Sequence, residues 1–500
     1  MAKRSPRYEN DYNYIERQPR NKSNWNYSGN AGSNPGSGNR AYAAGSGDSY
    51  YGRPKSRTAP VRPSGNSYAR GRHKKKKSKG GLIAVLVILV LLLAGLAVYV
   101  WKSRLPEPVE QVAEVVKPLP DAPKVAATAS IGATGDILLH LPILNAHETY
   151  DGYDFSPCFS NVSRVYDQVD YMIANLEVTL GGTESGEYTS YPAFNSPDEI
   201  VPALKNAGVD MCLTANNHSN DTGYYGMMRT LDVLDDYGID HLGSREETDE
   251  SYIFVKDING IRLGMVCYTY DTREYTEGEK SLNFNYLSDE AVQKICTFNY
   301  EYLDEFYDEL AQQLYYMDML NVDSKIVFMH WGTEYQDYPN DYQQTDIAQR
   351  LCDMGVDVII GGHPHVIQEF ETLTGANGHE TVCLYSMGNE LSNQRTDLMI
   401  DEDGGRGYTE DGLVIQVTFE KFNNGNTKIG AVNIVPTWVQ MDGNGYQIIG
   451  MDGSDPWSWG SSDTYAAIDS YNRTLGRLGD AYIQYREKKH QSEVTEYITG

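Results

Sequence analysis

The sequence predicts a mixed α/β domain with a layered sheet, placed behind an apolar helix and a polar tail. From about Ala129 onward, short apolar runs alternate with helical patterns, which is typical of α/β folds. The stretch from Leu82 to Trp101 is apolar apart from one glycine and one tyrosine. Before it, residues 1–79 contain few aliphatic side chains and much Asn, Gly, Ser, Tyr and Arg.

The N-terminal segment, residues 1–79, is predicted to be a disordered basic tail. It holds 18 Lys and Arg against 4 Asp and Glu, although the whole chain has a net charge of −27. The rest of the chain therefore carries −41. A segment of this composition cannot bury enough apolar surface to fold. The two ends are expected to face different surroundings or partners.

Residues 80–101 are predicted to form a single transmembrane helix. About 20 residues at roughly 1.5 Å each cross a hydrocarbon core of about 30 Å. A cleaved signal peptide is disfavoured by the long preceding tail and by the lack of an A-x-A site. Seven Lys and Arg lie between residues 70 and 79, whereas only Lys102 and Arg104 follow closely. This places the N-terminus in the cytoplasm and the large acidic part outside, with the lysines attracting anionic inner-leaflet lipid.

After the helix, residues 102–127 contain five prolines and are predicted to form an extended extracellular stalk. The strands that follow are expected at 129–134, 171–175, 209–215, 325–330, 356–360 and 381–386. Helices are expected at 161–169, 198–207, 224–237 and 345–354. Asn259-Gly260 predicts a hairpin, and residues 412–420 and 427–435 predict another. Long helices are expected over 289–320 and 462–489.

Polar side chains end five of the predicted strands. They are Asp136, Glu177, Asn217 with His218, His330, and His363 with His365. Each of these residues alone could be a turn or core residue. Five separate strand ends would then each need an unrelated reason to carry a polar residue, which disfavours that interpretation for the set. Ligands of open α/β sheets bind at the carboxyl ends of strands. Carboxylate, amide and imidazole donors together suit Mn, Fe or Zn rather than Ca or Mg, so the sequence predicts a metal site.

Four segments carry a resemblance to a known family. They are Ala-Asn-Asn-His at 215–218, His-Trp-Gly-x-Glu-Tyr at 330–335, Gly-x-His-Pro-His-Val at 361–366 and Ser-x-Gly-Asn at 386–389. Over residues 129–440 the chain resembles the poly-γ-glutamate capsule-biosynthesis protein CapA family, which is related to calcineurin-like metallophosphoesterases. The resemblance implies a four-layer α/β/β/α sandwich over 128–440, with 441–500 as a C-terminal extension.

The resemblance also implies roles for individual residues. One or two divalent ions would be held by Asp136 and His365 at a first site, by Asn217, His330 and His363 at a second, and by Glu177 between them. His218 would act as general acid with Glu334 as a second catalytic residue, and Trp331, Tyr335 and Asn389 would bind substrate. The chain departs from the phosphoesterase pattern where Leu138 replaces a ligand histidine. It departs from the CapA pattern where Glu390 replaces an aromatic residue.

The resulting expectation is a membrane-anchored cell-surface protein that takes part in the biosynthesis of a capsule or envelope polymer of the poly-γ-glutamate type, as a metal-dependent hydrolase or transferase. Its partners would be this polymer and other membrane proteins of polymer synthesis or export. Because the outer part carries −41, long-range charge opposes a polyanion, so an uncharged or wall-linked substrate stays open. A non-catalytic scaffold with a vestigial metal site and a phosphodiesterase of envelope esters are the alternatives.

Overall fold

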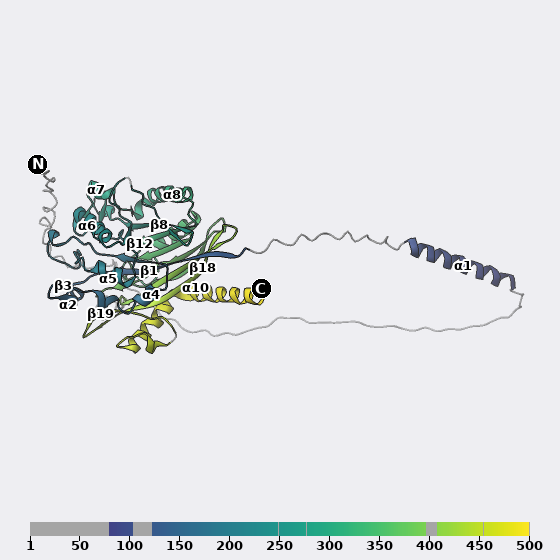
Figure 1. Ribbon diagram of the computed structural model, residues 1–500. Helices are drawn as coiled ribbons and strands as arrows, with labels where there is room; N and C mark the ends of the chain where they lie inside the picture. The colour runs from purple at the N-terminus through teal and green to yellow at the C-terminus, as the bar shows by residue number, and fades with distance from the viewer. Residues whose placement is uncertain are drawn as a thin grey trace, which may run out of the picture. The chain divides into compact units, whose positions relative to one another are not determined.

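The computed structural model describes residues 80–103, 123–248, 250–276, 278–396, 408–453 and 455–499. It divides into two compact units, residues 1–121 and 122–500. In the first unit the described part is helix α1 (Gly80–Ser103) (Figure 1). The predicted tail at 1–79 and most of the predicted stalk at 102–127 lie outside the described residues.

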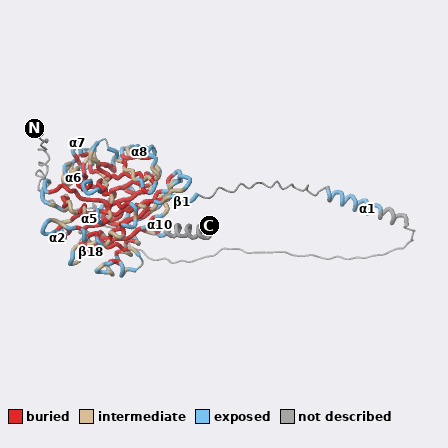
Figure 2. The backbone as a smooth tube through the Cα atoms, in the orientation of Figure 1, coloured by how far each residue is buried: buried red, intermediate tan, exposed pale blue. Residues whose placement is uncertain are grey.

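Helix α1 contains the apolar run. Its side chains are described at residues 88–100 and at residue 102, and all of these are exposed (Figure 2). Within the parts of the chain that the structure describes, none of the helices combines the length and hydropathy that a bilayer crossing requires. The predicted membrane span and its orientation therefore stay predictions.

The second unit is built on two large sheets. The first has the strand order β19-β18-β17-β1-β4-β5-β6, with β16 beside β1, and the second has the order β11-β8-β12-β13-β15-β14, with β7 beside β8. The first-sheet strands are β1 (Val125–Ile137), β4 (Tyr171–Leu176), β5 (Met211–Leu213), β6 (Asp240–Leu242), β16 (Asn389–Leu391), β17 (Asp411–Phe422), β18 (Thr427–Asp442) and β19 (Gly445–Gly450). The second-sheet strands are β7 (Phe254–Ile258), β8 (Ile261–Tyr270), β11 (Thr297–Phe298), β12 (Ser324–His330), β13 (Val358–Gly362), β14 (Phe370–Thr374) and β15 (Glu380–Leu384).

The remaining elements are short strands and helices around these sheets. Two small hairpins pair β2 (Glu148–Thr149) with β3 (Gly152–Tyr153) and β9 (Ser281–Leu282) with β10 (Asn285–Tyr286). The helices are α2 (Leu141–His147), α3 (Ser156–Phe159), α4 (Ser163–Tyr166), α5 (Ile200–Ala207), α6 (Gly223–Asp236), α7 (Asp289–Val292), α8 (Leu303–Met319), α9 (Asp346–Asp353) and α10 (Thr464–Thr499).

Three apolar cores separate the layers of this unit. One lies between the sheets and joins residues such as Ile131 of β1 to Phe328 of β12. A second lies between the first sheet and helices α2 to α6, and a third lies between the second sheet and helices α8 and α9. Figure 2 shows buried residues throughout the interior of this unit. The mixed α/β fold predicted from the sequence is confirmed.

Parallel pairing aligns the strand ends that carry the polar residues. In the first sheet, β1 runs parallel to β4, and β4 runs parallel to β5. In the second, β12 lies parallel between β8 and β13. Both predicted hairpins form, since β7 pairs with β8 and β17 pairs with β18 in antiparallel fashion. Asn259 and Gly260 have φ of 55° and 82°, as a two-residue hairpin turn requires.

The long helix predicted over 289–320 is wrong in its first half. The chain forms the single turn α7, then the short strand β11, and only then α8. The run Ile295-Cys296-Thr297-Phe298 is β-branched and aromatic, which favours a strand, and β11 pairs with the end of β8. The helix expected at 161–169 is also shorter, because α4 covers only Ser163–Tyr166.

The C-terminal segment is part of the same body. The predicted boundary at residue 440 falls inside β18, and β19 pairs with that strand. Helix α10 follows, with a non-helical residue at Gly479 (φ 75°), and places Leu478 and Tyr482 in the core between the sheets. The helix therefore closes one side of the sheet pair.

Candidate metal centre

Six predicted ligands lie together at the carboxyl ends of strands from both sheets. Asp136 is on β1, Glu177 follows β4, Asn217 lies in the loop after β5, His330 ends β12, and His363 and His365 follow β13. All six are at most 3% exposed. The strand ends thus bring carboxylate, amide and imidazole groups into one buried cluster, as the sequence predicted.

Two glycines allow the strands to approach each other at this cluster. A Cβ atom at Gly135 would lie 1.9 Å from the carbonyl oxygen of Gly388, and one at Gly362 would lie 2.9 Å from Oδ1 of Asp136. Any side chain at either place would push β1 away from its neighbours. The two histidines are also unusual, because His363 and His365 have φ of 98° and 58°. Such conformations cost about 1–3 kcal/mol and cluster at functional sites.

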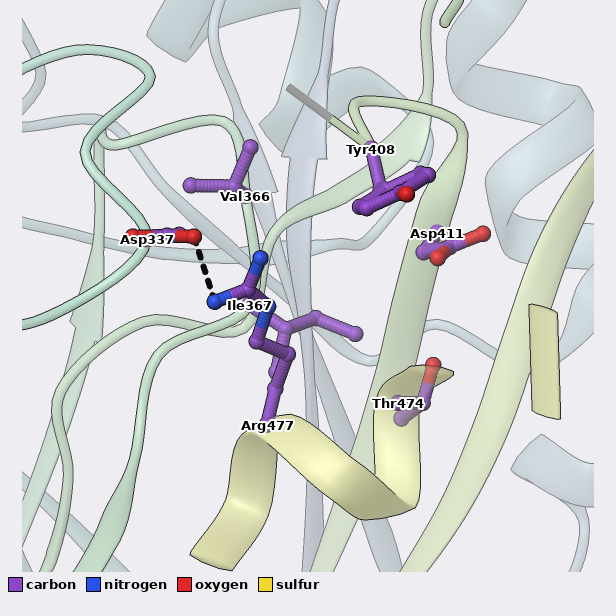
Figure 3. A pocket seen from close by; sticks show the side chains of 7 residues that line it. All are labelled: Asp337, Val366, Ile367, Tyr408, Asp411, Thr474 and Arg477. Carbon is purple, nitrogen blue, oxygen red and sulfur yellow. Dashed lines mark ion pairs between the residues drawn. The ribbon is translucent and has the colours of Figure 1, made fainter. Parts of the chain in front are cut away.

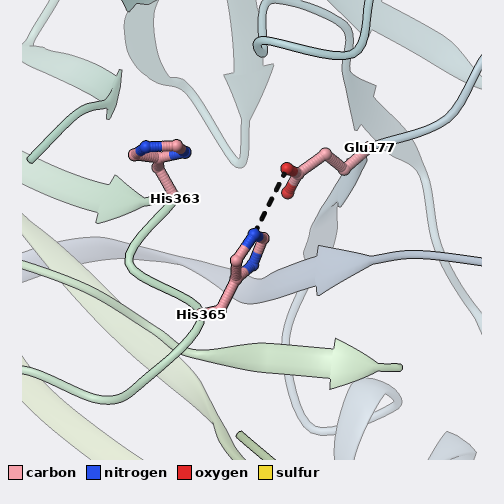
Figure 4. Close-up of side chains that lie close together, drawn as sticks. All are labelled: Glu177, His363 and His365. Atoms are coloured by element: carbon pink, nitrogen blue, oxygen red, sulfur yellow. Dashed lines mark ion pairs between the residues drawn. The ribbon is translucent and has the colours of Figure 1, made fainter. Parts of the chain in front are cut away.

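Glu177 lies at the centre of the cluster. Its Oε1 atom is 3.6 Å from Nε2 of His330 and 3.8 Å from Nε2 of His365. Figure 4 shows that the side chains of His363 and His365 lie close to that of Glu177. No described residue donates a hydrogen bond to Oε1, and Nδ1 of His363 is likewise without a partner among the described groups. A buried oxygen and a buried nitrogen are therefore left for a ligand.

Asp136 has a different environment. Its Oδ1 accepts a hydrogen bond from Nδ2 of Asn175 at 2.7 Å, and its Oδ2 accepts one from the backbone N–H of His363 at 3.2 Å. Nδ1 of His365 also lies 3.2 Å from Oδ2. Asp136 is thus held by the protein itself, and it fixes the position of the His-Pro-His loop.

The buried charges shift the pKa values of this cluster in opposite directions. Burial raises the pKa of Glu177 well above its ordinary value, with added repulsion from Asp136 and Glu334. Burial, and then neighbouring imidazoles, hold the pKa of His330 and that of His363 well below the usual value. Burial also acts against a charged His365, but its hydrogen bond and charge interaction with Asp136 leave the pKa of that imidazole raised.

The donor set fits a divalent cation. Ligand atoms of Asp136, Glu177 and His330 lie within 4.8 Å of one another, and so do those of Glu177, His363 and His365. Glu177 belongs to both groups. Two buried carboxylates, one of them with an unpaired oxygen, are costly without a cation, and a metal would use that oxygen of Glu177 and the unpaired Nδ1 of His363. Both buried groups are therefore consistent with a metal site.

His218 is held beside the cluster by a carboxylate. Its Nδ1 lies 2.7 Å from Oδ2 of Asp221, and its ring meets Phe194 edge-on at 4.8 Å. Burial raises the pKa of Asp221. Because Nδ1 faces Asp221, the Nε2 atom is the one left to exchange a proton with a ligand.

The amide of Asn217 connects this region to the cluster. Its Oδ1 accepts from Nε2 of His330 at 2.7 Å, and its Nδ2 donates to Oδ1 of Asn283 at 3.0 Å. Nδ2 of Asn283 is in turn 3.3 Å from Nδ1 of His218. The loop that carries Asn283 therefore borders the cluster.

The other predicted site residues have different positions. Glu334 is exposed, and its charge acts on Glu177 and His365. Tyr335 donates its backbone N–H to the Pro364 carbonyl at 2.8 Å, and its ring lies 5.8 Å from that of His365. Both residues are therefore at the edge of the cluster.

Asn389 and Trp331 have internal contacts instead. Oδ1 of Asn389 lies 3.0 Å from Nδ1 of His365, and the residue is fully buried, so it orients a ligand histidine. Trp331 is buried in the core under α9, where its Nε1 donates to the Tyr385 carbonyl at 2.9 Å. The prediction that Trp331 contacts substrate finds no support in these surroundings.

Sequence reasoning missed four residues near the cluster: Asn175, Asp221, Asn283 and His140. Asn175 lies two residues before Glu177, and Asp221 lies three after His218, so closeness to a predicted ligand was the available signal. His140 touches the same Phe194 ring as His218, at 5.3 Å. Burial and neighbouring His365 lower the pKa of His140 to about 4. Asn283 gave no signal, because it reaches the cluster from a distant turn.

The two departures from the family patterns are both buried. Leu138 is 1% exposed and belongs to the core between the first sheet and its helices, so it supplies no ligand. Glu390 is fully buried. It accepts hydrogen bonds from the hydroxyls of Thr134, Tyr166 and Thr437, at 2.5, 2.6 and 2.9 Å.

A separate small pocket lies next to the loops that bear Tyr335 and His365 (Figure 3). Arg477 of α10 forms an ion pair with Asp337 across it, at 2.5 Å. Ile367 and Thr474 line the pocket with these two residues. None of the six clustered ligands lines it, so we assign it to the attachment of α10 rather than to the metal centre.

Comparison with known proteins gives the family. A family model described as bacterial capsule synthesis protein PGA_cap matches residues 130–394. The PGA biosynthesis protein CapA of Bacillus subtilis (strain 168) is 24% identical over 364 residues, which is 72% of this chain and 82% of that protein. The capsule biosynthesis protein CapA of Bacillus anthracis is 26% identical over 332 residues, 64% of this chain and 70% of that one.

Among solved structures, the calcineurin-like phosphoesterase YfkN from Bacillus subtilis superposes with a TM-score of 0.34 at 15% sequence identity. The match covers 70% of this chain and 99% of that chain. The family model spans more than half of the 500 residues and includes all six clustered ligands. The chain belongs to the PGA_cap family of bacterial capsule synthesis proteins.

Proposed function

We propose that this protein is a metal-dependent hydrolase or transferase that acts on a capsule polymer at the outer surface of the cell membrane. The observation that carries the proposal is the pair of unsatisfied ligand atoms in the buried cluster, Oε1 of Glu177 and Nδ1 of His363. A protein that used this cluster only for folding would have gained from satisfying both atoms, because each buried unpaired polar group costs about 1–3 kcal/mol.

The cluster would hold one or two ions of Mn, Fe or Zn, since mixed carboxylate and imidazole donors suit these metals. The ligands would be Asp136, Glu177, Asn217, His330, His363 and His365. Such an ion supplies activation of water and polarisation of a phosphoryl or acyl oxygen. The chain's own contribution is a buried, preorganised set of donors, because all six side chains are at most 3% exposed and low local polarity strengthens charge interactions.

His218 is the proposed proton donor to the leaving group. The contact with Asp221 fixes its ring and occupies Nδ1, which leaves Nε2 for the reacting group. Glu334, exposed at the edge of the cluster, is the second proposed catalytic residue, and its charge reaches both Glu177 and His365. Tyr335 would contact substrate from the same edge.

The polymer class comes from the family and its named relatives, two of which are called PGA or capsule biosynthesis proteins. The membrane anchor is proposed from the sequence alone: the apolar run at residues 82–101 follows seven Lys and Arg, which would contact anionic lipid on the cytoplasmic side. Other membrane proteins of polymer synthesis or export are the proposed partners.

Metal analysis and an activity panel on the purified full-length chain test the proposal. The wild-type protein should contain about one or two equivalents of Mn, Fe or Zn and should cleave or transfer a capsule polymer or a model phosphoester. His363→Ala should lose both properties. His379→Ala is the matched control, because His379 is a partly exposed histidine paired with Asp357 away from the cluster. A metal-free, inactive wild type, or an active His363→Ala, would sink the enzyme assignment.

A non-catalytic scaffold in a polymer-export complex is the second candidate, and one observation favours it. Leu138 occupies the place of a ligand histidine and packs into an apolar core, so the first metal site is one imidazole short. Complementation separates the two candidates. If His330→Ala and His363→Ala restore capsule formation to a deletion strain as well as wild type does, the scaffold is the correct function.

The proposed topology has its own test. Protease added to intact cells should degrade residues 122–500 and leave the basic N-terminal tail protected. Full protection of the C-terminal domain would contradict an outer-surface location.

A further inference from the structure

His140 is an imidazole beside the metal cluster that has no role in the proposed mechanism. It lies between the end of β1 and the start of α2, four residues after Asp136, and it is only partly buried. Its ring meets that of Phe194 edge-on at 5.3 Å, and the ring of His218 meets Phe194 edge-on at 4.8 Å. The charges of His365 and His218 both act on His140. This imidazole therefore borders both the cluster and the proposed proton donor.

A backbone group fixes the tautomer of this ring. The N–H of Asn393 donates to Nδ1 of His140 at 3.3 Å, and a backbone N–H can act only as a donor. Nδ1 must therefore keep its lone pair, which places the proton of the neutral ring on Nε2. Burial, with the neighbouring charge of His365, also lowers the pKa of His140 to about 4. His140 is thus an uncharged ring whose Nε2–H is a hydrogen-bond donor.

Strand β16 and the loop after it hold His365 in the opposite tautomer. Nδ1 of His365 lies 3.0 Å from Oδ1 of Asn389 and 3.2 Å from Oδ2 of Asp136, and both oxygens are acceptors. The proton of His365 is therefore on Nδ1, and the lone pair of its Nε2 is left for a cation. In neutral His140 neither nitrogen offers a lone pair to a cation. His140 therefore does not replace the ligand that is missing at Leu138.

A neutral N–H donor beside a cation site suits an oxygen that carries negative charge. Donors that are fixed in advance stabilise such an oxygen without the cost of reorientation. The ring of His140 is fixed in this way, by the N–H of Asn393 at Nδ1 and by the edge contact with Phe194. A charged imidazolium at this place would repel a bound cation, whereas a neutral ring does not.

We propose that His140 binds the reacting group of the substrate, through a hydrogen bond from Nε2–H to a negatively charged oxygen of that group. The inference rests on the proposed function, because it adds a substrate contact to the proposed metal centre. It gives different tasks to the two imidazoles that meet Phe194. His218 exchanges a proton with the leaving group, whereas His140 keeps its proton and positions the oxygen.

Solid-state NMR of the metal-free full-length chain with ¹⁵N-labelled histidine tests the tautomer. The difference between the spectra of wild type and His140→Gln identifies the signals of this ring. We expect a neutral ring with its proton on Nε2 from about pH 6 to about pH 8, the range in which an ordinary histidine loses its charge. A proton on Nδ1, or a doubly protonated ring at these pH values, would overturn the inference.

Isothermal titration of inorganic phosphate into the Mn²⁺-loaded full-length chain tests the contact itself. His140→Phe keeps an aromatic ring against Phe194 but has no donor, so it should weaken phosphate binding about tenfold, as the loss of one hydrogen bond to a charged oxygen predicts. His140→Gln keeps an N–H donor and should recover most of the affinity. The metal content of all three proteins should be equal, because His140 is not a ligand.

His379→Phe is the matched control, since Nε2 of His379 lies 2.9 Å from the Val356 carbonyl, away from the cluster, and this variant should bind phosphate as wild type does. Three results would overturn the inference and leave the proposed enzyme standing: no phosphate binding by metal-loaded wild type, equal affinity in His140→Phe, or loss of a metal ion from His140→Gln. A wild type that takes up no metal would instead refute the proposed enzyme, and this inference with it.

Discussion

Two fully buried glutamates of the same domain, Glu177 and Glu390, have opposite surroundings. Three hydroxyl groups donate to the carboxylate of Glu390, whereas Oε1 of Glu177 has no donor among the described residues. Burial raises the pKa of both, that of Glu390 to about 7. The difference shows that this fold can satisfy a buried carboxylate with its own side chains. At Glu177 it does not, and it places imidazoles there instead, as a cation site requires.

The largest expected effect separates the two glutamates by their response to metal. At about 1,000 times its dissociation constant, a metal that binds only the folded state stabilises it by about 4.1 kcal/mol. We expect Mn²⁺ or Zn²⁺ to raise the unfolding free energy of wild type and Glu390→Gln by such an amount, and that of Glu177→Gln hardly at all. Denaturant titration with and without metal measures this. Equal stabilisation of all three proteins would show that the ion binds elsewhere.

The second effect is a pH dependence of the unfolding free energy that Glu390 causes. Its pKa is about 7 in the folded protein against an ordinary value of 4.5, so between these values the folded state holds a proton that the unfolded chain has released. The unfolding free energy should therefore fall as pH rises through this window, by about 3 kcal/mol in all at about 1.4 kcal/mol per unit.

Glu390→Gln should remove this slope. Urea unfolding of the metal-free protein from pH 4.5 to 8 checks the difference between wild type and variant, because contributions from Glu177 and the histidines are common to both. A parallel pH dependence of the two proteins would show that Glu390 does not titrate in this range.

A smaller effect should follow from removing one of the three hydroxyls. Thr437→Val deletes the donor that lies 2.9 Å from Oε2 of Glu390, and a lost bond to a buried acceptor costs about 1–3 kcal/mol. Thr372→Val, at an exposed position of β14, is the control and should change stability little. Metal binding should be the same in both variants, since neither residue lies in the cluster.

The smallest effect is expected at the ion pair between Arg477 and Asp337. Both side chains are more than a third exposed, and water and salt reduce such pairs to at most about 1 kcal/mol. Arg477→Ala should therefore lower the unfolding free energy by less than Thr437→Val does, and the loss should shrink further in high salt. A larger loss that salt does not change would show that α10 is attached mainly through apolar contacts at this place.

The sequence predicted the cluster because polar residues interrupt apolar strands at their ends, and parallel pairing aligns those ends. The alternation of side chains along a strand explains why Trp331 is buried away from the cluster. Successive residues near a strand end face opposite sides, so when His330 faces the cluster its neighbour faces the outer core. Applying this alternation to β12 would have placed Trp331 correctly.

Other features depend on contacts that the local pattern does not show. Asn283 reaches His218 from a turn 65 residues away, and Glu390 finds its hydroxyl donors on β1, α4 and β18. The end of α7 was missed because pairing of Thr297 and Phe298 with β8 outweighs the helical preference of the surrounding residues. In each case a long-range partner decides the structure.

The central claim, that the buried cluster is a metal centre, is tested most directly by anomalous diffraction from crystals of the protein grown with Mn²⁺. The account predicts at least one anomalous peak within coordination distance of Glu177 and His363. A peak only at the surface group of Asp235, His241 and Glu246 would contradict this claim. Absence of any peak in crystals that show well-ordered side chains for all six ligands would contradict it as well.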